Sequence, residues 1–158
     1  ASSTTPTTRP STPDDDYGQT VRIAAVNGDD PWTPRLLENV TCPVTRFGQG
    51  LANDLVGWDA HYCADRVSFT ACSDSEHIPV TLHIPGAFSL YNALAALAAA
   101  EAVIPVNGPL NGDLVGQALQ GVKVPGRIEQ IRTSPTIILD GGHNVNAAEA
   151  LRKACGLE

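Results

Sequence analysis

The sequence contains no methionine, even at its first position, and no long apolar run. A complete translated reading frame begins with methionine, so we expect this chain to be an excerpt. The most hydrophobic segment, Leu90 to Ile104, is interrupted by Asn92 and Glu101, and no run reaches the roughly 18 apolar residues that span a bilayer. The sequence therefore predicts no membrane segment and no membrane partner.

Basic residues are also scarce. Ten Lys and Arg face seventeen Asp and Glu, which gives a formal charge of −7. Nucleic acids and anionic membranes are bound by basic surfaces, so this balance argues against both partners. With 42% hydrophobic residues the chain can still bury a sizeable core. Acidic soluble enzymes of the cytoplasm have this composition.

The cysteines lack the spacing of metal or redox motifs. No CxxC pair occurs, so the sequence predicts neither a zinc site nor a redox pair. Free thiols are typical of the reducing cytoplasm. We therefore expect no metal ligands among the four cysteines, Cys42, Cys63, Cys72 and Cys155.

The N-terminal residues have a composition that does not form a core. Residues 1–13 are nearly all Ser, Thr and Pro, and Asp14 to Asp16 add a run of negative charge. Such segments bury too little apolar surface to offset the entropy of ordering. The sequence predicts a disordered tail over residues 1–20.

Short apolar or alternating runs then predict strands. The best of them are Val21 to Val26, Val44 to Phe47, Arg66 to Ala71 and Ile78 to Ile84. The last two belong to successive, antiparallel strands, and the wider segment 54–75 alternates only weakly. One or two helical turns are expected over residues 34–40.

An alanine-rich segment predicts a long helix from Leu90 to about Ile104. Ser89 is placed to cap it, and Leu90, Leu94, Leu97 and Ile104 form a core stripe. A shorter helix is predicted over residues 113–120, closed by Gly121.

The stretch from Val124 to Ala150 combines a hinge at residues 123–127, strands at 128–131 and 136–139, and a final helix with a capping-box-like start at Asn146 and Glu149. The β-branched run 136–139 predicts a buried strand whose carboxyl end delivers Asp140 into a crevice. Two glycines follow and allow close approach of a ligand. His143 and Asn144 then begin the helix, where an anion is favoured. Many nucleotide sites share this geometry.

The order of the motifs VNGDDPW, RFG, HIPGAFSLYNALAALAAAEA, VPGRIE and ILDGGHN resembles the Mur ligase family. These ATP-dependent ligases join an amino acid to a carboxylate, and they include muramyl-peptide ligases, folylpolyglutamate synthase and the cyanophycin synthetase tail. The resemblance covers about Ile23 to Leu151. It implies an α/β fold, in which residues 21–123 form the later part of a central ATP-binding domain. Residues 124–158 begin a Rossmann-like C-terminal domain.

The resemblance also implies a reaction and its nucleotide site. ATP phosphorylates the substrate carboxylate, and an amine attacks the acyl phosphate to give an amide, ADP and phosphate. By matching positions, Asn92 would bind adenine, Arg127 the phosphates, and Asp140 the ribose hydroxyls, with His143 beside the nucleotide. The loop of residues 27–31 would shape the cleft.

Each of these residues also has an ordinary structural interpretation. Asn92 suits a first helical turn, Arg127 a charged surface and Asp140 a turn, and His143 could bond backbone. In the cleft loop, which includes Asn27, Asp29 and Asp30, the two aspartates are better suited to a turn than to a metal site.

The sequence departs from the family pattern in several places. Ala87, Phe88 and Ser89 stand where an Arg or His, Phe and Asn are usual, and Val145 replaces a proline. A GxxGKT-like phosphate loop, the upstream Mg²⁺ ligands and a lysine of the carbamylated kind are absent. We therefore expect the chain not to catalyse alone, with Mg²⁺ ligands lying outside it.

Three functions remain open. The motifs NGDDPW and YNALAALAAAEA favour addition of a diamino acid to UDP-MurNAc-dipeptide in peptidoglycan precursor synthesis. RTSPTIILDGGHN favours folylpolyglutamate synthase, acting on folate and glutamate, or the cyanophycin-type tail. The third is a non-catalytic nucleotide-binding or interaction module.

Overall fold

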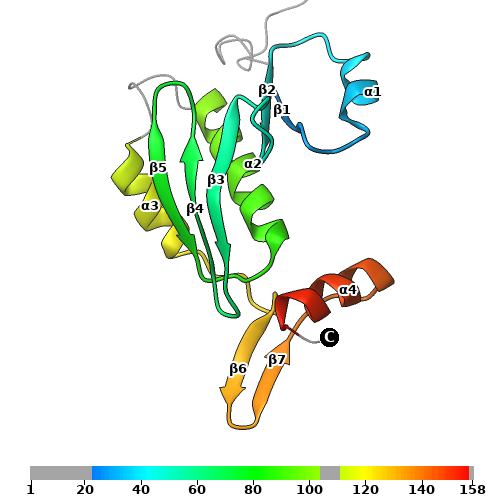
Figure 1. Cartoon of the computed structure of the whole chain (residues 1–158), viewed down its shortest axis with the longest axis vertical. Helices are drawn as coiled ribbons and strands as arrows, with labels where there is room; N and C mark the ends of the chain where they lie inside the picture. Colours follow the sequence, from blue (N-terminus) through cyan, green and yellow to red (C-terminus); the bar gives the residue numbers. More distant parts are fainter. Residues whose placement is uncertain (1–22, 104–110, 157–158) are drawn as a thin grey trace, which may run out of the picture.

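The computed structural model describes residues 23–103 and 111–156, and its centre is a five-stranded sheet (Figure 1). The strands lie side by side in chain order. They are β1 (Ala24–Asn27), β2 (Val44–Gly48), β3 (Leu55–Tyr62), β4 (Val67–Cys72) and β5 (His77–Leu82). A short helix, α1 (Thr33–Leu37), lies between β1 and β2 in the chain. The predicted tail of residues 1–20 lies outside the described residues.

The direction of the strands changes at β3. The pairs β1–β2 and β2–β3 are parallel, whereas β3–β4 and β4–β5 are antiparallel. The predicted antiparallel pairing of the last two strands is confirmed. The sequence did not predict β3 as a separate strand, because a register irregularity between Trp58 and His61 interrupts its alternation.

Helix α2 (Ala87–Val103) crosses one face of this sheet and packs on β1 to β4. Leu90, Leu94 and Leu97 are buried in the core, so this part of the predicted stripe is confirmed. Ile104 lies outside the described residues. Gly57 of β3 allows the close approach, since a Cβ there would lie 3.1 Å from Leu90 Cδ2.

The predicted cap of α2 is wrong. The helix begins at Ala87, so Ser89 lies inside its first turn. The Ser89 hydroxyl donates a hydrogen bond of 3.3 Å to the Pro85 carbonyl, and the backbone N–H of Ser89 donates to the Gly86 carbonyl. The serine therefore ties the helix back to the preceding turn.

Helix α3 (Gly112–Gln120) packs on β5 and agrees closely with its prediction. The Asn111 side chain accepts from the backbone N–H of Leu114 at 3.1 Å, and Gly121 follows the last helical residue.

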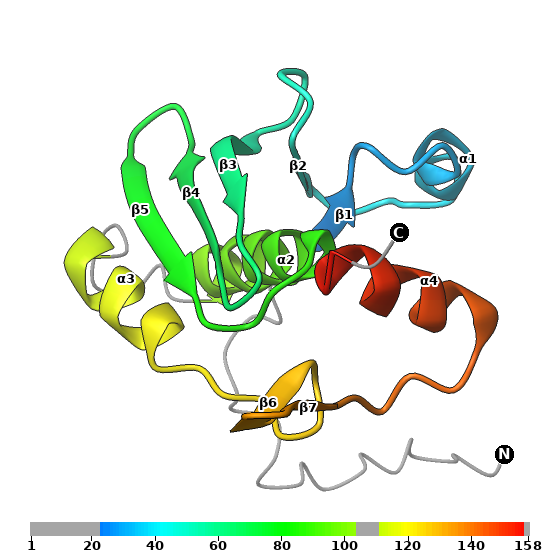
Figure 2. The same cartoon turned by 60° about the horizontal axis from the view of Figure 1, so that its bottom comes forward.

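The remainder of the described chain is a hairpin, β6 (Glu129–Thr133) and β7 (Thr136–Leu139), followed by α4 (Val145–Ala154). Figures 1 and 2 show them outside the larger sheet, at the end where α2 begins. The prediction of a buried strand at 136–139 is wrong, because all four residues are exposed. Within the described residues β7 pairs only with β6, and a two-stranded sheet without a second layer covers neither of its faces.

The start of α4 also differs from its prediction. Asn144, and not Asn146, is the cap: its side chain accepts from the backbone N–H of Ala147 at 2.8 Å. Glu149 instead pairs with Lys153 one turn later, at 3.3 Å. The capping box fails because the helix begins one residue before Asn146.

The described helices are short or carry polar residues. None of them combines the length and the apolar character that crossing a bilayer demands.

Candidate functional site

The turn that leads from α3 to β6 places Arg127 against α2. The backbone N–H of Arg127 donates to the Val124 carbonyl at 3.1 Å, and Gly126 adopts a positive φ of 71°. The Arg127 guanidinium lies over the Phe88 ring, with 4.4 Å between Cζ and the ring centroid. A cation over an aromatic face is an attractive arrangement. Phe88 is therefore a partner of Arg127 that the sequence did not reveal.

Asp140 joins the end of β7 to the segment just before β6. Its carboxylate accepts from the backbone N–H of Ile128 at 2.9 Å and from that of Gly142 at 2.7 Å. Ile128 is buried and has φ of 47°, which is a strained conformation for a β-branched residue. The bond from Ile128 to Asp140 helps to hold this strained residue in place.

The turn after Asp140 is tight. A Cβ on Gly142 would lie 2.7 Å from Asp140 Oδ1 and 2.9 Å from Ala147 Cβ, so this position needs a glycine. The backbone N–H of Gly141 donates to the Gly126 carbonyl at 2.7 Å. His143 is exposed, and its Nδ1 lies 3.3 Å from the Gly141 carbonyl oxygen. The turn thus contacts the turn at residues 124–127 through a backbone hydrogen bond.

A small cavity brings together two of the residues that the sequence singled out. It has a volume of about 30 Å³, room for about one water molecule. Arg127, Asp140 and Phe88 line it, and α4 closes it from the other side. The full lining is Phe88, Arg127, Ile128, Asp140, Ala147, Ala150 and Leu151.

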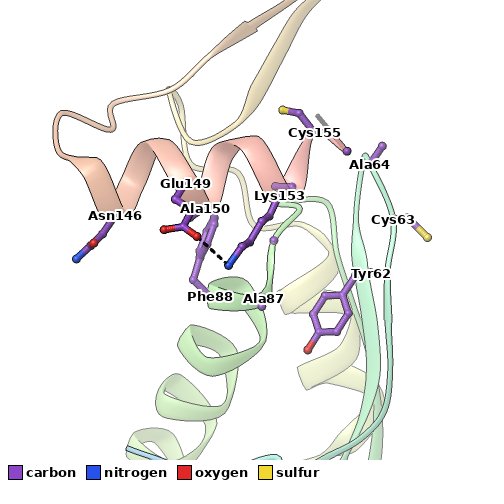
Figure 3. Close-up of a pocket in the computed structure, with 13 residues that line it drawn as sticks. Tyr62, Cys63, Ala64, Ala87, Phe88, Asn146, Glu149, Ala150, Lys153 and Cys155 are labelled. Atoms are coloured by element: carbon purple, nitrogen blue, oxygen red, sulfur yellow. Dashed lines mark ion pairs between the residues drawn. The ribbon is translucent and has the colours of Figure 1, made fainter. Parts of the chain in front are cut away.

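A larger cleft of about 650 Å³ opens beside it (Figure 3). Its walls are the β3–β4 turn at residues 62–64, the start of α2 at residues 86–88, and one face of α4. In Figure 3 the Phe88 side chain points from the start of α2 toward Ala150 of α4. None of the four predicted nucleotide residues lines this cleft. Arg127 and Asp140 line the smaller cavity, whereas Asn92 and His143 line neither of the two.

Asn92 lies one helical turn after Phe88 on α2 and is exposed. Its side chain makes no hydrogen bond to another described residue. Within residues 23–103 and 111–156, neither the donor nor the acceptor of its amide is occupied.

The loop after β1 is organised by Asp29. The carboxylate accepts four hydrogen bonds that join three segments of the chain. The donors are Gln49 N at 2.6 Å, Gly50 N at 3.1 Å, Asn53 Nδ2 at 2.8 Å and the Tyr91 hydroxyl at 3.0 Å. Partial burial raises the pKa of the Asp29 carboxyl, but the hydrogen bonds outweigh it and the net pKa is lowered.

The other two residues of the cleft loop stabilise turns. Asn27 Oδ1 accepts from Asp29 N at 3.1 Å, and its carbonyl accepts from the Thr33 hydroxyl. Asp30 Oδ1 accepts from Trp32 N at 2.8 Å. Their contacts agree with the interpretation of this loop as a turn. No group of three or more His, Cys, Asp or Glu that could hold a metal ion occurs within residues 23–103 and 111–156.

Tyr91 links this loop to Asn92, its neighbour on α2. Burial, together with the hydrogen bond to Asp29 and its negative charge, raises the pKa of Tyr91 to about 12. Tyr62 donates to Gln49 Oε1 at 3.1 Å, which extends the network to β3. Sequence reasoning missed Tyr91 although it lies within the motif YNALAA, because its partner is 62 residues away.

The mixed sheet covered by α2, with the hinge and the strand–turn–helix unit after it, defines an α/β protein. Residues 15–100, more than half of the chain, match the sequence model of the Mur ligase middle domain. The chain belongs to the Mur ligase family. Both the α/β fold and the resemblance noted in the sequence are thereby confirmed.

Individual relatives give the same result. The UDP-N-acetylmuramoyl-L-alanyl-D-glutamate–2,6-diaminopimelate ligase of Geobacter sulfurreducens is 31% identical over 135 residues, which is 84% of this chain and 26% of that protein. The dihydrofolate synthase/folylpolyglutamate synthase of Mycobacterium tuberculosis is 35% identical over 81 residues, 50% of this chain and 17% of that protein. The chain thus spans about a quarter, or less, of the length of these relatives.

Solved structures show the same fold. MurF from Acinetobacter baumannii superposes with a TM-score of 0.76 and 21% identity, over 89% of this chain and 30% of that one. The folylpolyglutamate synthase of Mycobacterium tuberculosis, solved with ADP, gives a TM-score of 0.71 and 23% identity, over 85% and 30%.

Proposed function

We propose that this chain is part of an ATP-dependent ligase that joins an amino acid to a carboxylate through an acyl phosphate. The observation that carries the proposal is the shared cavity of Arg127 and Asp140 at the junction of α2 with α4. A cation suited to phosphate and a carboxylate suited to hydroxyls lie together there. The solved relative with ADP supports a nucleotide as the ligand.

Each residue has a defined role in the proposed site. The Arg127 guanidinium binds the phosphates of ATP. Asp140 accepts from the ribose hydroxyls, because each of its oxygens accepts one backbone N–H and retains a lone pair. Asn92 binds adenine through its amide, and His143 lies beside the nucleotide. The loop of Asn27, Asp29 and Asp30 shapes the cleft through the contacts of Asp29.

Mg²⁺ accompanies ATP in such a reaction, and we tested whether the described residues fit it. They do not form a site, since no cluster of three ligating side chains occurs among them. Asp29, the carboxylate with the most partners here, already accepts four hydrogen bonds. We therefore assign Mg²⁺ to none of the described residues and derive no step through it.

The proposed substrates are UDP-MurNAc-dipeptide and a diamino acid, in the cytoplasmic synthesis of a peptidoglycan precursor. The 2,6-diaminopimelate ligase supports this choice because its similarity extends over 84% of the chain. Folate and glutamate are the second candidates, supported by the folylpolyglutamate synthase that is similar over 50% of the chain. A non-catalytic nucleotide-binding module is the third.

We further propose that residues 21–123 belong to the central domain and residues 124–158 to the C-terminal domain. The separation of the five-stranded sheet from the hairpin and α4 supports this division (Figure 2). The turn at residues 124–127 lies between the two parts.

A ligase assay on the natural protein that contains this chain tests the function. ADP release is measured with UDP-MurNAc-dipeptide and diaminopimelate, and in parallel with folate and glutamate. We expect the first pair to support turnover, and Asp140→Ala to raise the KM for ATP about tenfold. Turnover with the second pair alone selects the folate ligase, and ATP binding without any turnover selects the non-catalytic module. An unchanged KM removes Asp140 from the ribose site.

Binding to the isolated chain gives a second test. The chain lacks a phosphate loop, so we expect ATP to bind with millimolar or weaker affinity. Micromolar affinity in calorimetry would contradict this.

A further inference from the structure

In the described part of the chain, the guanidinium of Arg127 contacts an aromatic ring and forms no ion pair with an acidic group. Three acids that share a cavity lining with Arg127 have other partners. Glu129 accepts from the backbone N–H of Gly126 at 2.8 Å, Asp140 accepts from two backbone N–H groups, and Asp65 pairs with Arg66 at 3.0 Å. The ring of Phe88, with its centroid 4.4 Å from Arg127 Cζ, contacts the face of the guanidinium.

An aromatic partner and a carboxylate partner occupy different parts of an arginine side chain. A carboxylate partner occupies the N–H groups of an arginine, which lie in the plane of the guanidinium. An aromatic ring contacts the face of that plane instead. Stacked on Phe88, Arg127 therefore keeps its in-plane donors available to an incoming anion.

The turn before α2 is shaped to seat this ring. Gly86 has φ of 99°, and a Cβ there would lie 2.6 Å from Phe88 Cε1 and 3.1 Å from its Cζ. A side chain at residue 86 would therefore meet the ring and strain the backbone. Phe88 also lines both the small cavity and the larger cleft, together with residues of α4 (Figure 3).

We propose that Phe88 is a positioning residue that holds the face of Arg127 and leaves the guanidinium edge for the phosphates of the nucleotide. This inference rests on the function proposed above, in which Arg127 binds phosphate. Phe88 acts through Arg127 and does not touch the nucleotide itself.

The test compares two ligands on the isotope-labelled chain, with affinities measured by NMR titration, which detects millimolar binding. ATP carries phosphates, and adenosine lacks them. Phe88→Leu keeps an apolar side chain but removes the ring. We expect it to weaken ATP binding about two- to fivefold, the fold-change that a partly exposed cation–π contact supplies, and to leave adenosine binding unchanged. Phe88→Tyr keeps the ring and should bind ATP like the parent.

A double-mutant cycle isolates the pair. In an Arg127→Gln background, Phe88→Leu should cause no further loss of ATP affinity. In the ligand-free chain, Phe88→Leu should also remove the ring-current shift of the Arg127 side-chain signals. Trp58→Leu removes an exposed ring from β3 and serves as the matched control, with no effect expected on either measurement.

The outcomes separate the inference from the function on which it rests. Equal losses for ATP and adenosine, or a Phe88→Leu effect that persists with Arg127→Gln, would overturn the positioning role. Unchanged ATP affinity in Phe88→Leu, with a loss in Arg127→Gln, would overturn it while leaving the proposed function intact. If Arg127→Gln itself binds ATP like the parent, the phosphate role of Arg127 in the proposed function is wrong as well.

Discussion

The Tyr91 hydroxyl donates a hydrogen bond of 3.0 Å to Asp29, across 62 residues of sequence. Through this contact the loop after β1 is fixed to the helix that carries Asn92. The same carboxylate accepts from Gln49, Gly50 and Asn53 of the β2–β3 connection. Asp29 is therefore the point at which the loop after β1, the β2–β3 connection and α2 meet.

Asp29→Asn should lower the free energy of unfolding at pH 7 by about 1–2 kcal/mol, a value reduced for the solvent exposure of the site. The four donors are divided between the two carboxylate oxygens of Asp29, whereas the amide of asparagine offers them a single acceptor oxygen. Because folding lowers the pKa of Asp29 from its ordinary value of 3.8, its contribution is present above that value and is lost as the pH falls through the folded-state pKa. Urea unfolding between pH 2 and 7 measures both effects.

Asp30→Asn is the matched control for this prediction. Asp30 accepts one backbone hydrogen bond, which an amide oxygen can also accept, so we expect little change. An equal decrease in the free energy of unfolding for Asp29→Asn and Asp30→Asn would show that Asp29 is not the centre of the network.

Tyr91 should ionise well above its ordinary value of 10.0. Folding raises its pKa to about 12, so the stability that Tyr91 contributes is complete below pH 10 and is lost as the pH rises from 10 to 12. The difference in ultraviolet titration between the parent and Tyr91→Phe isolates this group. Asp29→Asn should move the transition back toward 10, and a transition near 10 in the parent would contradict the assignment.

An alanine variant is usually more stable than a glycine variant at the same position. The strained backbone at Ile128 should reverse this order of stability. Ile128→Gly and Ile128→Ala both remove a buried side chain, but only glycine adopts the φ of 47° without a steric penalty. We expect the glycine variant to be more stable than the alanine variant by about 1 kcal/mol. At the buried Ile78 of β5, where φ is not positive, alanine should be the more stable of the two. Thermal unfolding of the four variants measures the difference, and the same order at both positions would rule out strain at Ile128.

The cap of α4 gives a prediction with its control two residues away. Asn144→Ala should destabilise the helix by about 1 kcal/mol, because it removes the acceptor for the Ala147 N–H. Asn146→Ala should change stability by less than about 0.5 kcal/mol. Amide hydrogen exchange within α4 measures the destabilisation by each variant. A larger destabilisation by Asn146→Ala would support the capping box predicted from the sequence.

Local sequence patterns predicted where helices and strands form better than they predicted which residues those elements bury. Residues 136–139 form a strand as predicted, because β-branched side chains favour extended backbone wherever they lie. Their burial was predicted wrongly, since burial depends on which other segments pack on the strand. Asn144 and Asn146 both suit a cap, and only the position at which the helix begins decides between them.

Local sequence patterns could not predict the contacts of the candidate site, because the residues in contact are far apart in the chain. Asp29 and Tyr91, or Phe88 and Arg127, are distant in sequence, and each pair meets only once the sheet and α2 are assembled. The residues of the motifs could be named in advance, whereas their partners required the fold.

The two backbone bonds to Asp140 have a consequence for recognition at the junction. Because one oxygen is held by Ile128 and the other by Gly142, the carboxylate is oriented by the main chain before any ligand arrives. A hydroxyl that binds there meets a side chain whose rotamer entropy was already lost on folding. This carboxylate is preorganised, and its orientation depends on the backbone positions of Ile128 and Gly142.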